Sequence, residues 1–97
     1  MKKEKLKQKL EVLNAQIIQS KDLVDDDYTK AYLCNLEKLV KSYQDKIDKN
    51  VLNKSDGGNL GFRRAILEYD NLAEIDSLYD AACEVDSYYS LECKSWN

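Results

Sequence analysis

Residues 3–24 read KEKLKQKLEVLNAQIIQSKDLV, and this stretch decides the fold. Its apolar residues recur at intervals of three and four, the spacing that lines one side of an α-helix with a narrow stripe of the coiled-coil type: Leu6, Leu10, Leu13, Ile17 and Val24. Lysine and glutamine residues fill the other sides. We therefore expect a first helix from about Lys3 to about Ser20.

A second helix is predicted from about Asp27 to about Asn50, after a short polar link. The aspartates at 25–27 suit a helix start, because carboxylates accept hydrogen bonds from free backbone N–H groups and complement the positive end of the helix dipole. So short a link predicts that the two helices pack as an antiparallel hairpin. The expected apolar side consists of Tyr28, Tyr32, Leu36, Leu39, Tyr43 and Ile47, flanked by Leu33, Val40 and Val51.

The remaining chain is predicted to form two further helices after a loop. Residues 53–61 (NKSDGGNLG) hold all three glycines. Beyond them, apolar residues fall on two different helical faces, which favours a break near Asp70–Asn71 between helices at about 61–69 and 71–90. Asn71 and Glu74 are spaced as in a capping box. One bent helix is the alternative. The expected fold is all-α, a single domain of residues 1–97: a hairpin (1–52), a loop (53–61) and an acidic helical segment (62–97), packed as a small bundle.

The composition agrees with this fold. The 97 residues include no proline, and 43% of them are hydrophobic and 34% charged. Such a chain suits one helical domain. We expect neither a secretory signal nor a membrane span, and the three cysteines fit no disulfide framework. We expect reduced thiols in a cytoplasmic protein, with Cys34 and Cys83 buried and Cys93 in an exposed terminus.

The sequence contains no histidine, which removes the commonest general base and metal ligand. We expect no catalytic centre, no metal site and no cofactor. Gly57, Gly58 and Gly61 precede a helix start with Arg63 and Arg64 close behind. A helix start with two arginines can hold an anion, so Gly58, Arg63 and Arg64 form a candidate anion site. An ordinary interhelical turn is the favoured interpretation, because neither phosphate-loop spacing is present.

The charges divide the chain. Residues 1–54 carry 12 basic and 9 acidic side chains, a net of +3, and residues 55–97 carry 3 and 9, a net of −6. On the last predicted helix, Asp76, Asp80 and Glu84 stand at intervals of four and form an acidic face, with Asp70 and Glu74 nearby. Like charges at this spacing repel one another on a helix. The acidic face is either a solvated surface or a docking surface for a basic partner. With the aromatic Tyr88 as an anchor, the candidate partner-binding residues are Asp70, Glu74, Asp76, Asp80, Glu84 and Tyr88.

Residues 36–40 (LEKLV), followed by Tyr43 and Gln44 on the second arm of a hairpin, are similar to the small aspartyl-phosphate phosphatases that regulate sporulation. The resemblance covers about residues 5–47. It implies a regulator that docks on a response regulator. The Ser-x-x-x-Asp pattern of that family falls on Leu33 and Glu37, so the serine and the aspartate are both replaced.

The leading functional hypothesis is a non-catalytic module that binds a larger cytoplasmic protein through its acidic helical face. The partner has a basic surface and handles nucleic acid. In general character the chain resembles phage-encoded inhibitors of host or defence machinery, including anti-CRISPR proteins. Direct binding to nucleic acid or to a membrane is not expected. The alternatives are the response-regulator ligand and a structural homo-oligomer that pairs through Leu6–Ile17.

Overall fold

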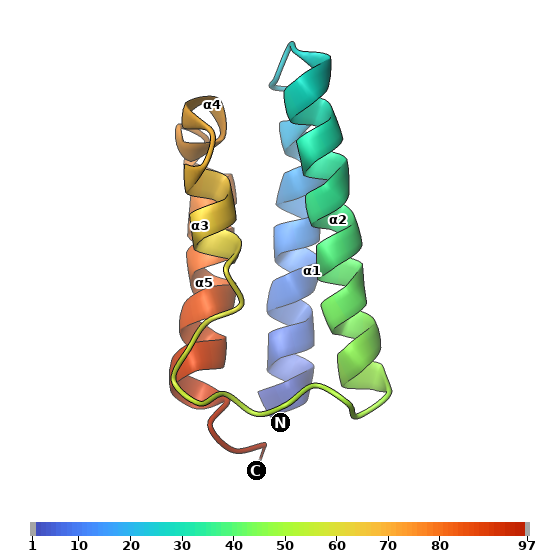
Figure 1. The fold of residues 1–97 in the computed structure, drawn as a ribbon, viewed down its shortest axis with the longest axis vertical. Coiled ribbons are helices and arrows are strands. Elements are labelled where there is room, and N and C mark those ends of the chain that lie inside the picture. Colours follow the sequence, from blue (N-terminus) through green and yellow to red (C-terminus); the bar gives the residue numbers. More distant parts are fainter. Residues whose placement is uncertain (1, 97) are drawn as a thin grey trace.

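The computed structural model describes residues 2–96, which form five α-helices and no β-strand. The helices are α1 (Lys2–Ser20), α2 (Asp27–Asp48), α3 (Phe62–Leu67), α4 (Asp70–Ala73) and α5 (Asp76–Glu92). The chain runs along α1, returns along α2, crosses one end of the bundle, rises through α3 and α4, and returns along α5 (Figure 1). The predicted all-α bundle with its antiparallel hairpin is confirmed. No helix within residues 2–96 is long and apolar enough to cross a membrane.

The apolar stripe of α1 forms the centre of the core. Leu6, Leu10, Leu13 and Ile17 are fully buried, and Val24 is nearly so. They are buried from two sides, because α1 packs against α2 and against α5. Burying a side chain of this size stabilises a fold by about 2 kcal/mol. The stripe that defines the first helix in the sequence therefore joins the two halves of the protein.

The predicted aspartate cap of α2 is confirmed at Asp26. Its carboxylate accepts hydrogen bonds from the backbone N–H of Thr29 at 2.8 Å and from the Thr29 hydroxyl at 2.6 Å. These two hydrogen bonds lower the pKa of the Asp26 carboxyl. At the other end, Asn50 adopts a left-handed conformation, and the Val51 N–H donates to the carbonyl of Lys46 at 2.9 Å. This left-handed residue ends the helix slightly earlier than predicted.

Aromatic side chains fill the space between α2 and α3. The hydroxyl of Tyr32 donates to the carbonyl of Ala65 at 2.8 Å, and the rings of Tyr43 and Phe62 meet edge to face with centroids 5.7 Å apart. Leu33, Leu36, Val40 and Ile47 are buried as predicted. The prediction was wrong at the margins of this stripe, because three of its members are exposed: Tyr28, Leu39 and Val51.

The second half of the chain breaks twice, where the sequence predicted one break. Tyr69 has an extended backbone, which places its ring between those of Tyr28 and Tyr32, with centroid distances of 6.5 and 4.4 Å. Asn71 lies inside α4 and its amide donates to the Thr29 hydroxyl at 3.4 Å. The capping-box prediction for Asn71 is therefore wrong, because the side chain serves a contact with α2.

The loop between α2 and α3 is fastened to the end of α5. The backbone N–H of Ser55 donates to the carbonyl of Cys93 at 2.7 Å, and the Tyr89 hydroxyl donates to the carbonyl of Asn53 at 2.7 Å. Because these bonds hold the last turn of α5, Cys93 is fully buried. The predicted cysteine environments are corrected as follows: Cys34 is exposed, Cys83 half-buried and Cys93 buried.

These environments predict an order of thiol reactivity. Burial raises the pKa of the Cys93 thiol to about 11, so thiolate is scarce at neutral pH and the sulfur is shielded from reagents. We expect Ellman's reagent to modify Cys34 rapidly, Cys83 more slowly and Cys93 only after unfolding. Mass spectrometry of time points identifies each site, and denaturant should expose all three. Equal rates for Cys34 and Cys93 in the folded protein would contradict this arrangement.

Candidate partner-binding surface

Carboxylates from two distant segments meet at one end of the bundle. Asp70, Glu74 and Asp76 lie in and beside α4, at the same end as the link between α1 and α2 (Figure 1). The contacts of Tyr28 with Tyr69 and of Thr29 with Asn71 join the start of α2 to α4. We call this surface the acidic end and define it by its exposed carboxylate residues: Asp25, Asp26, Asp27, Asp70, Glu74 and Asp76.

The carboxylates of the acidic end are not neutralised within the described chain. Three ion pairs occur among residues 2–96: Lys7 with Asp48, Lys9 with Glu84, and Lys21 with Glu37. None of them involves a member of the acidic end. Two exposed apolar side chains, Leu23 and Tyr28, lie next to the carboxylates in the sequence. The surface therefore combines carboxylates that form no ion pair within the described chain with solvent-exposed apolar side chains.

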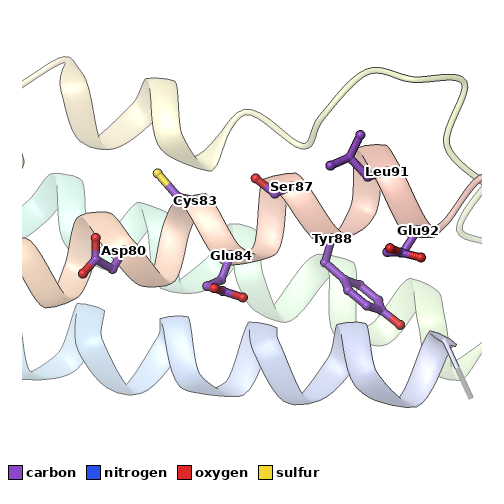
Figure 2. Close-up of a pocket in the computed structure, with 7 residues that line it drawn as sticks. All are labelled: Asp80, Cys83, Glu84, Ser87, Tyr88, Leu91 and Glu92. Carbon is purple, nitrogen blue, oxygen red and sulfur yellow. The ribbon is translucent and has the colours of Figure 1, made fainter.

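The other predicted binding residues lie along α5, on a different surface. Asp80, Glu84 and Tyr88 line a shallow depression of about 460 Å³ together with Cys83, Ser87, Leu91 and Glu92 (Figure 2). Glu84 and Tyr88 point toward α1. The Lys9 ammonium pairs with Glu84 at 3.0 Å and lies 5.3 Å from the centre of the Tyr88 ring. The predicted acidic face is thus divided between the acidic end and this depression, where Lys9 already neutralises one carboxylate.

The candidate anion site has its backbone donors engaged within the chain. The N–H groups of Phe62 and Arg63, at the start of α3, donate to the carboxylate of Asp86 on α5 at 3.2 and 2.8 Å. The Arg63 side chain donates to the Tyr79 hydroxyl at 2.9 Å, while Arg64 is exposed. Gly58 lies in the loop, and its N–H donates to the Asp56 side chain at 3.1 Å. The position that an external anion would take on α3 is filled by a carboxylate of the protein itself.

Asp86 is the important residue that the sequence analysis missed. It is buried, and burial raises the pKa of its carboxyl, although the N–H groups of Arg63 and Phe62 act in the opposite direction. One signal was present in the sequence. Gly61 precedes α3 and has no side chain that could cap it, so the cap has to come from elsewhere. The sequence does not show which residue supplies it.

Replacing Asp86 by Ala is expected to lower the free energy of unfolding by about 2–4 kcal/mol, because two backbone donors lose their acceptor, one of them buried. Asp86→Asn keeps one acceptor oxygen and should cost less.

The pKa of the Asp86 carboxyl is raised in the folded protein, so the contribution of Asp86 to the free energy of unfolding falls as the pH rises through this folded-state pKa. The free energy of unfolding of wild type, relative to that of Asp86→Asn, should therefore increase as the pH falls from about 7 to about 4. Denaturant unfolding followed by circular dichroism measures both effects.

Equal stability of Asp86→Ala and wild type would show that the Asp86 carboxylate does not hold α3. A difference between wild type and Asp86→Asn that shrinks or stays constant as pH falls would contradict the raised pKa.

Within residues 2–96 the structure shows no group of three or more histidine, cysteine, aspartate or glutamate side chains arranged to hold a metal ion. Comparison with known proteins gives no match to a family model, to a curated protein or to a solved structure. The functional argument therefore depends on the surfaces described above.

Proposed function

We propose that this protein is a non-catalytic binding module that docks its acidic end on a basic surface of a larger protein, as an inhibitor or an adaptor. One observation carries the proposal: segments about 45 residues apart in the sequence bring exposed carboxylates to one end of the bundle, and no ion pair within the described chain neutralises them. Like charges gathered in this way repel one another, and a cationic partner relieves that repulsion.

The surroundings of these carboxylates favour a protein as the partner. Leu23 is 66% exposed and Tyr28 is 76% exposed. Aromatic and apolar side chains that lose their water on binding supply much of the affinity of protein interfaces, while charges around them steer the encounter. Nucleic acid itself is repelled by this surface. A protein that binds nucleic acid carries a complementary basic surface, so the proposed partner class is a cytoplasmic nucleic-acid-handling protein, as for the phage-encoded inhibitors.

No observation in the structure favours the response-regulator alternative. The two positions that the phosphatase resemblance aligns with its Ser-x-x-x-Asp pattern are Leu33, which is buried, and Glu37, which pairs with Lys21.

The test compares two charge reversals of equal size. Asp25→Lys with Glu74→Lys alters both segments of the acidic end, whereas Glu11→Lys with Asp45→Lys alters exposed carboxylates elsewhere. Both double variants change the net charge equally. We expect wild type and the Glu11/Asp45 variant to capture the same basic protein from a lysate of the source cell, and the Asp25/Glu74 variant to lose it. With the purified partner, the association rate should fall at least about tenfold for the Asp25/Glu74 variant.

The proposal fails if both double variants lose binding equally, which would indicate a net-charge effect. It also fails if the Asp25/Glu74 variant binds as well as wild type while circular dichroism shows that both are folded.

A further inference from the structure

One broad side of the bundle, formed by α1 and α5, carries opposite charges on its two helices. α2 and α3 cover the other side of these helices (Figure 1), and Figure 2 views α5 and α1 from the uncovered side. The α1 edge is basic, with Lys5 and Lys9. The α5 edge is acidic, with Asp80, Glu84 and Glu92. We call this surface the α1/α5 face.

The two edges run antiparallel in a known register. Lys9 pairs with Glu84, and the Lys2 ammonium donates to the Ser95 hydroxyl at 3.4 Å. Lys5 lies between Lys2 and Lys9 on α1, so it stands at the level of the last turn of α5, where Glu92 lies. Neither Lys5 nor Glu92 takes part in an ion pair within residues 2–96, and both are exposed.

We infer that two copies of this chain pair face to face through the α1/α5 face, about a two-fold axis parallel to the helices. This rotation keeps each residue at its height and places α1 of one copy over α5 of the other. Lys5 of each copy then lies across from Glu92 of the other copy, at the same height along the helices. A two-fold axis across the helices would instead place the two basic α1 edges over one another. The charge pattern therefore selects both the occupant and the axis.

Apolar surface lies along this face. Val12 is 57% exposed on the α1 edge and Leu91 is 69% exposed on the last turn of α5, with the half-buried ring of Tyr88 in both depressions of the face. Because charged residues outnumber apolar ones here, we expect a dimer with a dissociation constant in the micromolar range.

The dimensions of the molecule favour its broad side. A stable interface buries about 800 Å² on each partner. The described chain measures 42 by 22 by 16 Å, so a broad side of 42 by 22 Å offers enough area for two copies to pair in this way.

The decisive experiment restores the charge pairs between two different variants. Lys5→Glu and Glu92→Lys each place like charges opposite one another in a dimer of identical copies. Each change also suits the dipole of its own helix end, so neither should unfold the protein. Measured by sedimentation equilibrium, each variant alone should dissociate at least about tenfold more readily than wild type. An equimolar mixture of the two should dimerise again, because the carboxylate introduced in one variant then meets the ammonium introduced in the other.

Matched apolar changes provide the control. Val12→Gln should weaken the dimer, whereas Val51→Gln, at a residue of similar exposure beyond α2, should leave it unchanged. A wild-type protein that sediments as a monomer up to millimolar concentration would overturn the inference, as would a mixture that remains monomeric. A wild-type monomer that binds the partner captured above through the α1/α5 face would overturn it too and assign this face to that partner. The inference does not depend on the acidic end, since none of these variants alters it.

Discussion

The burial of the apolar stripe of α1 from both sides is the constraint on which the rest of the structure depends. α2 and α5 both pack on α1, so the positions of the hairpin and of the second half of the chain are set by the same side chains. Leu6, Leu10, Leu13 and Ile17 have no exposed surface left within one chain. A homo-oligomer that pairs through this seam would therefore require a different packing, because a second copy could reach it only after α2 or α5 had separated from α1.

The same constraint leaves the flanks of α1 to charged residues. On one flank, Lys7 and Lys21 pair with Asp48 and Glu37 of α2. On the other, Lys9 pairs with Glu84 of α5. These groups are all partly exposed, and each such pair contributes little to stability. Their main effect is on register, since like charges at the same positions would oppose it. The charged side chains that take no part in these ion pairs then lie on surfaces that no other helix covers.

A buried carboxylate caps the short helix α3 from a distant part of the chain. α3 has six residues, too few for an isolated helix to persist in water. Asp86 accepts from its first two N–H groups, and the ring of Phe62 packs on Tyr43. One side chain of α5 therefore fixes where α3 begins, which in turn places Tyr69 against Tyr28 and brings α4 to the end of the hairpin. The acidic end depends on this chain of contacts.

The features that the sequence predicted correctly are those set by local spacing. The stripe of α1 follows from periodicity, and the cap at Asp26 from the preference of helix starts for carboxylates. The features it missed join residues far apart in the chain. In the sequence Asp86 is one of several acidic residues of the same helix, and its role as a cap becomes evident only when α3 lies beside it. Asn71 fits a capping box but bonds to Thr29. Cys93 was predicted to lie in an exposed terminus, but the backbone N–H of Ser55 donates to its carbonyl and holds it against the bundle.

Taken together, the two proposals imply that the two surfaces are coupled through electrostatics. A two-fold axis along the helices sets the acidic ends of both copies at the same end of the dimer, and their mutual repulsion opposes pairing. A basic partner that neutralises those carboxylates removes part of that cost, so its binding strengthens the dimer. By reciprocity, pairing of the copies strengthens the binding of the partner by the same factor. The dimer also presents two docking surfaces side by side, which raises the effective affinity for a partner with a broad basic surface. The weak pairing that the polar α1/α5 face supports makes this coupling visible, because the population of a dimer that formed completely without the partner could not rise further.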